Sequence, residues 1–230
     1  MLDFDGVLAP IVPHYKDARM SAKTRRLLAA CARRGTVAVI SGRALADVRR
    51  RVAMPTVWYA GNHGAEWHMG KARAQSNTPA MERRALIVAR AEFEQLAKRY
   101  PGIEVEDKKL TLGIHFRALP RRRVGAFKKE ATRIARQFSR TLDAAEGIQF
   151  ISVRPLHGYT KGNATQLARR LAPKGLVPIF IGDDATDEDA FRALKGGITV
   201  RVGRSSKSAA RFFVRTRADV DALLETLSML

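Results

Sequence analysis

Three apolar runs in this sequence end abruptly at polar residues, and this pattern constrains the fold more than any other feature. The runs lie in LDFDG (2–6), VISGR (39–43) and IFIGDD (179–184). Helical patterns separate them along the chain. Strands that alternate with helices usually pair in parallel, because each crossover helix covers a face of the sheet. The sequence therefore predicts an α/β fold with a doubly wound parallel sheet.

The first and last thirds of the chain follow this alternation. Strands are predicted at residues 36–41, 56–62, 177–182 and 198–203. Helices are predicted at residues 21–34, 44–52, 161–171 and 218–229, with a short helix near 187–194. Residues 61–77 are rich in glycine, histidine and polar residues, which indicates a loop or a short hairpin.

The middle of the chain has a different pattern. A long helix at 80–99 stops at Tyr100-Pro101-Gly102, and two alternating strands follow within 103–119, joined at 107–109. A helix at 121–141 and a strand at 148–153 complete this part. The simplest account is an α+β module at 78–157, inserted into a core that consists of residues 1–77 and 158–230.

Composition excludes several classes of protein. Hydrophobic residues make up 46% of the chain, which favours a packed core over disorder. The single cysteine, Cys31, allows no internal disulfide and suits a reducing compartment. The sequence holds neither a stretch of ~18 uncharged apolar residues nor a basic and then apolar signal region. We therefore expect a soluble, cytoplasmic protein.

The chain is strongly basic, with 42 Lys and Arg against 22 Asp and Glu residues. In stretches such as 82–99 and 121–140 the basic residues alternate with apolar ones at helical spacing, which is typical of solvated helix faces. No zinc finger, RRM or KH motif is present. A rival interpretation, a nucleic-acid binder, rests on net charge alone. We expect a monomer whose partner is an anionic small molecule, and no binding to nucleic acid or membrane.

Carboxylates follow two of the predicted strands. Asp3 and Asp5 are two residues apart, so in an extended strand they point to the same face. Asp183 and Asp187 follow another strand, and the carboxyl ends of parallel strands share one edge of the sheet. Four convergent carboxylates repel one another unless a cation lies among them. Oxygen ligands of this kind suit a hard divalent ion, and Mg²⁺ fits best.

A site of carboxylates and Mg²⁺ calls for an anionic substrate, usually a phosphate. Ser41 lies at a strand end, where its hydroxyl and nearby backbone N–H groups can bind phosphoryl oxygens. Lys161 lies at a helix start and can neutralise charge on an attacking carboxylate and on the phosphoryl group. Arg43 offers a second cation.

Four segments match, in order, the four motifs of the haloacid dehalogenase superfamily of phosphotransferases: DFDGVL (3–8), VISGR (39–43), TKGNA (160–164) and IGDDATDEDAF (181–191). Three more, GNHGAEW (61–67), VEDKKLTLGIHFR (105–117) and VRP (153–155), resemble the trehalose-6-phosphate phosphatase family. The resemblance covers nearly the whole chain. It implies a Rossmann-like core with a mobile α+β cap, and a phosphoric monoester hydrolase of trehalose biosynthesis that converts trehalose 6-phosphate to trehalose and phosphate.

The resemblance also implies roles for individual residues. Asp3 would be the nucleophile that forms an aspartyl-phosphate, and Asp5 would be the general acid and then the general base. Asp3, the backbone carbonyl of Asp5 and Asp183 would bind Mg²⁺, with Asp187 as a ligand or as a residue that orients one. Ser41 and Lys161 would hold the phosphoryl group. In the cap, Glu106 and Lys108 would hydrogen-bond the sugar; further substrate-binding candidates are Arg43, Asn62, His63, His115 and Arg117.

Two departures from the family pattern leave alternatives open. Family members often carry a sugar-binding Glu where this chain has Ser152, so the substrate can be another sugar phosphate, such as a glucosyl- or mannosyl-linked ester, hydrolysed by the same mechanism. Only Met1 and Leu2 precede Asp3, whereas a central strand usually has ~5–6 residues. We expect either a truncated or misassigned start or an unusually short first strand. A protein that kept the fold but lost turnover is the third alternative.

Overall fold

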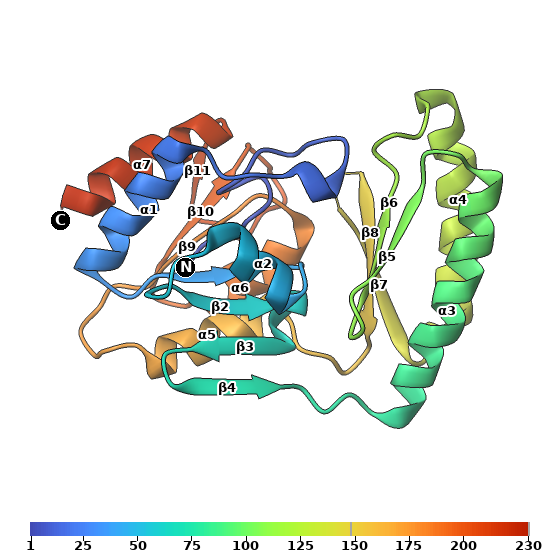
Figure 1. Cartoon of the computed structure of the whole chain (residues 1–230), viewed down its shortest axis with the longest axis horizontal. Coiled ribbons are helices and arrows are strands. Elements are labelled where there is room, and N and C mark those ends of the chain that lie inside the picture. Colours follow the sequence, from blue (N-terminus) through green and yellow to red (C-terminus); the bar gives the residue numbers. More distant parts are fainter. Residues whose placement is uncertain (148, 230) are drawn as a thin grey trace. The chain divides into compact units, whose positions relative to one another are not determined.

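The chain divides into two units, each with its own sheet and hydrophobic core. Figure 1 shows the computed structural model, which describes residues 1–147 and 149–229. Unit 1 consists of Met1–Val12, Asp17–Gln75 and Tyr159–Leu230. Unit 2 consists of Pro13–Lys16 and Ser76–Gly158. The short segment 13–16 thus groups with the central part of the chain, from which more than fifty residues separate it.

Unit 1 is built on a mainly parallel sheet, as the sequence predicts. One half has the order β1-β2-β3-β4 and the other the order β11-β10-β9. The strands are β1 (Ala38–Ile40), β2 (Trp58–Gly61), β3 (Glu66–Met69), β4 (Ala72–Gln75), β9 (Ile179–Gly182), β10 (Ile198–Val202) and β11 (Phe212–Val214). Leu2 pairs in parallel with both Val39 and Ile181, so it joins the two halves. The hairpin β3–β4 is antiparallel.

Helices cover both faces of this sheet. They are α1 (Ala22–Arg34), α2 (Leu45–Val52), α5 (Lys161–Leu171), α6 (Glu188–Ala193) and α7 (Arg217–Met229). Unit 1 also contains the short 3₁₀ turns η2 (Asn62–Gly64) and η3 (Ala185–Asp187), whereas η1 (Tyr15–Asp17) begins in segment 13–16 of unit 2. Residues of α1, α2 and α7 share one core with Val39 and Ile181. Residues of α5 and α6 share another with Ile40 and Phe180, which point to the opposite face. The predicted doubly wound α/β fold is confirmed.

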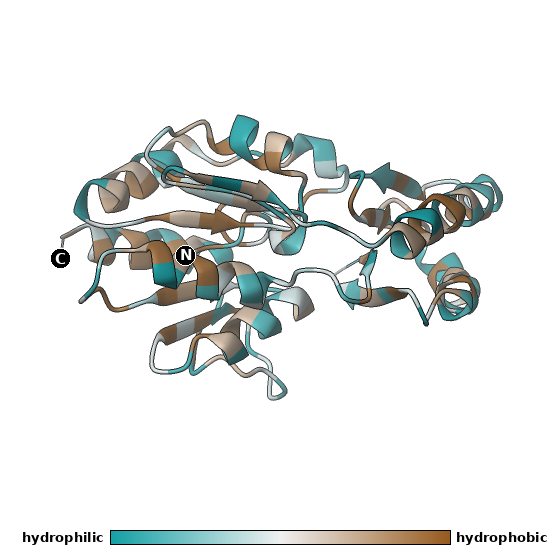
Figure 2. Ribbon diagram, turned by 90° about the horizontal axis from the view of Figure 1, so that it is seen from below, coloured by the Kyte–Doolittle hydropathy of each residue, from teal (hydrophilic) through white to brown (hydrophobic). Residues whose placement is uncertain are grey.

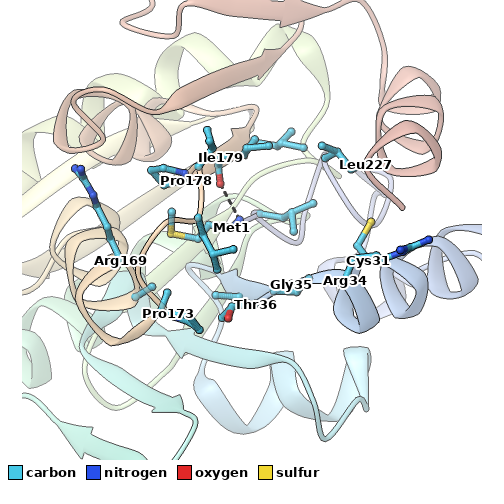
Figure 3. Close-up of a pocket in the computed structure, with 18 of the residues that line it drawn as sticks. Met1, Cys31, Arg34, Gly35, Thr36, Arg169, Pro173, Pro178, Ile179 and Leu227 are labelled. Atoms are coloured by element: carbon cyan, nitrogen blue, oxygen red, sulfur yellow. Dashed lines mark hydrogen bonds between the residues drawn. The ribbon is translucent and has the colours of Figure 1, made fainter. Parts of the chain in front are cut away.

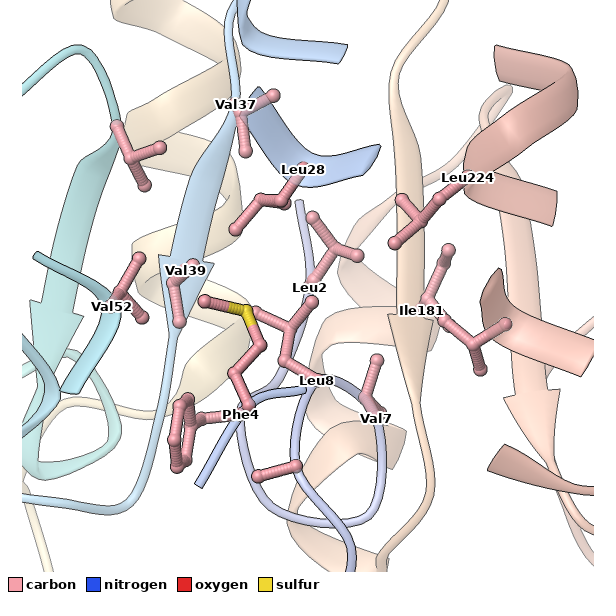
Figure 4. Packing of buried hydrophobic residues seen from close by; sticks show 14 of the residues in the cluster. Leu2, Phe4, Val7, Leu8, Leu28, Val37, Val39, Val52, Ile181 and Leu224 are labelled. Atoms are coloured by element: carbon pink, nitrogen blue, oxygen red, sulfur yellow. The ribbon is translucent and has the colours of Figure 1, made fainter. Parts of the chain in front are cut away.

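Figure 4 shows how the first core surrounds the N-terminal segment. Leu2 and Phe4 are buried there, and Leu28 from α1 and Leu224 from α7 pack in the same cluster. Full burial of an aliphatic or aromatic side chain is worth about 1.5–3 kcal/mol. Asp3 therefore lies between two strongly anchored neighbours, although it is only two residues from Met1.

Unit 2 is an antiparallel sheet covered by two helices. The strands β5 (Glu104–Asp107), β6 (Leu112–His115), β7 (Leu142–Gly147) and β8 (Phe150–Pro155) have the order β5-β6-β8-β7. The helices α3 (Ala80–Arg99) and α4 (Arg121–Gln137) bury Phe93 and Phe127. Figure 2 shows hydrophobic and hydrophilic residues alternating along both helices, at the right of the view, as in amphipathic helices.

Two predictions for this unit were wrong. The helix predicted to reach residue 141 ends at Gln137, because the Ser139 hydroxyl donates to the Arg136 carbonyl and the Thr141 hydroxyl to that of Phe138. These bonds satisfy carbonyls that a longer helix would use. Strand β7 follows, where the sequence indicated no strand. The strand predicted from 148 begins at Phe150; position 148 itself lies outside the described residues.

Figure 3 shows an apolar cavity of about 310 Å³ in unit 1. Met1, Thr36, Pro173, Ile179 and Leu227 are among the residues that line it. Thr36 precedes β1 and Ile179 begins β9, so the cavity lies at the amino ends of the strands. Ligands of open α/β sheets bind at the carboxyl ends, so the functional site is expected at the opposite end of the strands from this cavity.

Within residues 1–147 and 149–229, no helix combines the length and the apolar composition needed to cross a bilayer.

Candidate active site

The sheet brings Asp3 and Asp183 together at the carboxyl ends of neighbouring strands. Asp3 follows Leu2, and its N–H donates to the Ile181 carbonyl at 2.9 Å. Asp183 directly follows β9, of which Ile181 is a member. Both side chains are buried, with 5% and 6% of their surface exposed. The prediction that these two acidic segments share one edge of the sheet is confirmed.

Asp187 completes a buried cluster of three carboxylates. Oxygens of Asp3, Asp183 and Asp187 all lie within 4.8 Å of one another. Lys161 Nζ lies 2.7 Å from Asp3 Oδ2 and 2.8 Å from Asp187 Oδ1, so it bridges two of the three. Lys161 is the first residue of α5, whose start is fixed by a capping box between Thr160 and Asn163.

Asp187 also shapes the turn after β9. Its Oδ2 accepts the backbone N–H groups of Asp183 and Asp184, both at 3.0 Å. Its Oδ1 accepts from Lys161, so Asp187 fixes the lysine side chain and the turn at Asp183 relative to each other. Two glycines make room for the cluster. A Cβ at Gly182 would lie 2.3 Å from Asp187 Cγ, and a Cβ at Gly6, where φ is +75°, would lie 2.0 Å from Asp183 Oδ2.

The charges of this cluster do not balance. Burial raises the pKa of Asp3 to about 7, with the charge of Asp187 adding to the shift and Lys161 opposing it. Burial also raises the pKa of Asp183, and Asp3 and Asp187 add to the effect. Burial would lower the pKa of Lys161, but the two carboxylates outweigh it and raise that pKa. One ammonium cannot neutralise three buried carboxylates, so this all-oxygen donor set fits a divalent cation.

Asp3 should make the metal-free protein less stable as the pH rises from about 4 to about 7, and the difference between the parent and Asp3→Asn isolates this contribution from that of the buried Met1 ammonium, whose pKa is lowered to about 5. The raised pKa means that folded Asp3 keeps a proton that the unfolded chain has released in this range, so folding loses free energy as the pH rises. Three pKa units correspond to about 4 kcal/mol at most. Urea unfolding in the presence of a chelator measures the fall. With Mg²⁺ in place of the chelator the fall should be smaller, because Mg²⁺ binds the ionised folded state. A stability difference between the parent and Asp3→Asn that changes neither with pH nor with Mg²⁺ would contradict the cation site.

Asp5 does not join the cluster, contrary to the prediction that four carboxylates converge. The strand ends at Asp3, and the chain then turns. Arg43 holds the Asp5 carboxylate in a bidentate contact, with Nε to Oδ2 at 2.7 Å and Nη2 to Oδ1 at 2.8 Å. Arg43 Nη1 donates to Asp47 Oδ2 at 2.8 Å. Arg43, predicted as a substrate-binding cation, is thus engaged with two carboxylates.

Asp47 is a site residue that sequence reasoning missed. Burial would raise its pKa, but hydrogen bonds from Arg51, Arg50 and Arg43 lower that pKa to about 2. Asp47 therefore stays ionised at neutral pH and anchors the Arg43 guanidinium from α2. The available signal was its place in the first turn of the predicted helix 44–52, which begins directly after Arg43.

The remaining predicted residues of unit 1 lie next to this network. Ser41 follows β1, and its Oγ accepts the Arg43 N–H at 3.2 Å. Asn62 and His63 form the turn η2 directly after β2. All three side chains are buried, with at most 1% of their surface exposed.

Unit 2 gathers a second set of predicted residues on its sheet. Glu106 Oε2 lies 2.9 Å from His115 Nε2 and 3.6 Å from Lys108 Nζ. Arg117 follows β6 and is half-buried. Glu106 pairs with Gly113, which pairs with Ser152 on the next strand, so Ser152 lies in the same row as Glu106. The residue that departs from the family pattern is therefore part of this cluster's row.

Two further residues of unit 2 escaped sequence reasoning. Tyr15 stacks on His115 with ring centroids 4.2 Å apart and planes 8° apart, although a hundred positions separate them. Gly113 lies beneath the cluster, where an added Cβ would be 3.1 Å from Glu106 Oε2 and from His115 Nε2. No local pattern marks either contact, because one depends on the fold of segment 13–16 and the other on strand register.

The family model described as trehalose-phosphatase matches residues 1–218. A trehalose-phosphate phosphatase of Mycobacterium avium is 36% identical over 200 residues, which are 85% of this chain and 51% of the relative. One of Mycobacterium tuberculosis is 38% identical over 194 residues, 82% of this chain and 49% of the relative. The chain thus spans about half the length of these curated relatives.

Solved structures show the same fold. The C-terminal domain of a Candida albicans trehalose-6-phosphate phosphatase superposes with a TM-score of 0.83 at 23% identity, covering 100% of this chain and 91% of that one. A trehalose-6-phosphate phosphatase related protein gives a TM-score of 0.79 at 24% identity, covering 99% and 96%. At these identities the likeness speaks for the fold alone.

Proposed function

Because the chain belongs to the trehalose-phosphatase family, we propose that it is a magnesium-dependent phosphatase that hydrolyses trehalose 6-phosphate to trehalose and phosphate. The observation that carries the proposal is the buried cluster in which Lys161 bridges Asp3 and Asp187 beside Asp183. Such a cluster combines a carboxylate nucleophile, a fixed cation and a set of oxygen ligands at one strand edge. These are the parts that phosphoryl transfer through an aspartate requires.

In the first step, an Asp3 carboxylate oxygen attacks phosphorus, and the bond between phosphorus and the sugar oxygen breaks. Asp5 gives a proton to the leaving oxygen, which requires that its carboxyl group be protonated and leave its contact with Arg43. In the second step, Asp5 takes a proton from water, which attacks phosphorus and releases Asp3. Lys161 keeps Asp3 oriented through its Oδ2, and the Ser41 hydroxyl donates to a phosphoryl oxygen.

Asp3, the backbone carbonyl of Asp5 and Asp183 would hold Mg²⁺, with Asp187 orienting Asp183. Bound Mg²⁺ supplies the positive charge that keeps Asp3 ionised and offsets the charge of the phosphoryl group. Asp187 suits an orienting role, because its oxygens accept from Lys161 and from two backbone N–H groups.

Unit 2 would supply the sugar contacts through Glu106, Lys108 and His115, with Arg117 nearby. The row from Glu106 across Gly113 to Ser152 offers a carboxylate at one end and a hydroxyl at the other. A hydroxyl can accept and donate, so it can bind a sugar, but it lacks the charge of the usual glutamate. This difference is the observation that favours the second candidate, the same chemistry on another sugar phosphate.

Phosphate release from a panel of sugar phosphates tests the proposal. We expect trehalose 6-phosphate to have the highest kcat/KM, and the rate to depend on added Mg²⁺. A preference for a monosaccharide phosphate or for another glycosyl-linked ester would establish the second candidate instead. Absence of release from every ester, with Mg²⁺ present, would remove the phosphatase assignment.

Glu106→Gln is expected to lower kcat/KM for trehalose 6-phosphate by about 10- to 100-fold, the equivalent of one charged hydrogen bond. The change should fall on KM, because the sugar contact is remote from phosphorus. Hydrolysis of p-nitrophenyl phosphate, which has no sugar, should stay nearly unchanged. Glu92→Gln, an exposed position on α3, is the matched control. Equal losses on both substrates would place Glu106 in the chemistry rather than in sugar recognition.

A further inference from the structure

We propose that Asn62 and His63 are positioning residues that brace the loop Ser41–Arg43, and that they do not bind the substrate. The inference rests on the proposed phosphatase function, in which this loop holds the phosphoryl group. The sequence suggested both residues as substrate contacts. Both are almost fully buried, at 0% and 1% exposed surface, as Ser41 is, so the contacts of their turn decide between the two roles.

Backbone N–H groups of η2 make the bracing contacts. Asn62 N–H donates to the Arg43 carbonyl at 2.7 Å, and His63 N–H donates to the Ser41 carbonyl at 3.0 Å. Two consecutive N–H groups therefore bind the two ends of the loop. Ser41 N–H in turn donates to the Ala60 carbonyl at 2.9 Å, which ties the loop to β2.

This arrangement needs an unusual backbone. Asn62 has a φ of 49° and His63 a φ of 59°, both in the left-handed region that residues other than glycine seldom adopt. Two successive residues in this region are strained, and such strain persists only where surrounding contacts enforce it. Surrounding contacts therefore hold the turn in this conformation, and the two backbone hydrogen bonds to the loop are among them.

The His63 side chain adds a steric contact. Its ring lies against Gly42, the middle residue of the loop: a Cβ there would be 2.6 Å from His63 Cε1 and 2.8 Å from Nε2. The imidazole thus occupies the space that any larger residue at position 42 would need. Gly42 and His63 form a matched pair, with the loop backbone on one side and the ring on the other.

The same turn also contacts the helix that carries Lys161. Gly64 has a φ of 105°, and a Cβ there would lie 2.8 Å from the Thr160 carbonyl and 2.9 Å from Ala164 Cβ. The segment 62–64 therefore touches both the Ser41 loop and the first turn of α5. It thus lies against both segments that carry the groups that would hold the phosphoryl oxygens, the Ser41 hydroxyl and the Lys161 ammonium.

A double-variant experiment tests the pair. Gly42→Ala should lower kcat on trehalose 6-phosphate and on p-nitrophenyl phosphate alike, by about 100-fold, because a misplaced loop costs that much. His63→Ala should cost about 10-fold on both substrates, and Gly42→Ala with His63→Ala should recover most of the loss of Gly42→Ala, because the new methyl group finds the vacated space. Losses that multiply in the double variant would overturn the matched pair. So would a His63→Ala variant with raised KM for the sugar phosphate and unchanged p-nitrophenyl phosphate hydrolysis, since a substrate contact gives that result.

Two substitutions at Asn62 test the role of its backbone conformation. Asn62→Gly should keep kcat within about threefold, because glycine adopts positive φ freely, whereas Asn62→Val should lose about 30-fold or more. Equal losses would mean that the Asn62 side chain matters, and would overturn its assignment as a brace. His68→Ala, a half-buried histidine on β3, is the control.

Amide hydrogen exchange separates this inference from the proposed function, because it needs no turnover. Exchange at Gly42 and Arg43 should be about tenfold faster in His63→Ala than in the parent chain or in His68→Ala. Unchanged exchange would overturn the brace even in an active enzyme. Faster exchange in a chain that hydrolyses no phosphate ester would support the brace and remove only the proposed function.

Discussion

Asp3→Asn is expected to lower phosphate release by about 10,000-fold or more, as loss of a nucleophile does. Asparagine has nearly the same shape, and its amide can still meet Lys161, so the protein should fold. Metal-free stability near neutral pH should even rise, because one of the carboxylates with a raised pKa is gone. Single-turnover assays with Mg²⁺, together with thermal unfolding, measure both effects.

The matched control is Asp17→Asn, the same chemical change at an exposed position. It should leave activity and stability unchanged. Unaltered turnover in Asp3→Asn would show that phosphorus is attacked by another group, either a different side chain or water directly. Trapping of a phosphorylated chain distinguishes these two possibilities: a phosphorylated chain that persists in Asp3→Asn indicates another side chain, and none in either protein indicates water.

Lys161→Met should lower the free energy of unfolding by about 3–5 kcal/mol, the cost of removing one partner from a buried ion pair. Lys161 Nζ lies within 2.8 Å of both Asp3 and Asp187, and its side chain is 2% exposed. Methionine fills the volume but leaves two buried carboxylates without a cation. Activity should fall as well, because the phosphoryl group loses a fixed positive charge. Urea unfolding at neutral pH in the presence of a chelator gives the stability change.

A second substitution separates charge from packing. Adding Asp187→Asn to Lys161→Met removes one of the stranded carboxylates and should restore part of the stability, but none of the activity. Lys174→Met, at an exposed position, controls for the loss of a lysine. If Lys161→Met is as stable as the parent, the carboxylates are already neutral when folded, and the electrostatic description of the cluster is wrong.

Elements with strong end signals could be predicted to the residue. The helix predicted at 80–99 is α3, stopped at Tyr100-Pro101-Gly102, and the one predicted at 161–171 is α5, started by the Thr160 cap. Strands β7 and β11 were missed. The β7 sequence, LDAAEG, has few residues that favour strands, and it is extended because it pairs with β8 along its whole length. That pairing comes from the tertiary fold, so no local pattern announces it.

The site likewise contains residues that could be placed from the sequence and contacts that could not. Asp3, Lys161 and Asp183 could be placed together because each lies at the end of a strand or the start of a helix, and the α/β fold brings such ends to one edge. The engagement of Asp5 with Arg43, and the stacking of Tyr15 on His115, could not be predicted. Both depend on how a short irregular segment turns after residue 3, and side-chain spacing does not encode that turn.

Leu2 links the folding of the sheet to the assembly of the site. Its backbone pairs with Val39 on one side and Ile181 on the other, so the strand bearing the catalytic candidate is the seam of the sheet. The Ser41 loop and the Asp183 turn come from opposite halves and meet only once that seam has closed. Folding of the sheet and assembly of the site should therefore occur together. Substitutions that disrupt the pairing of Leu2 should abolish both, and a partly folded chain should have no residual activity.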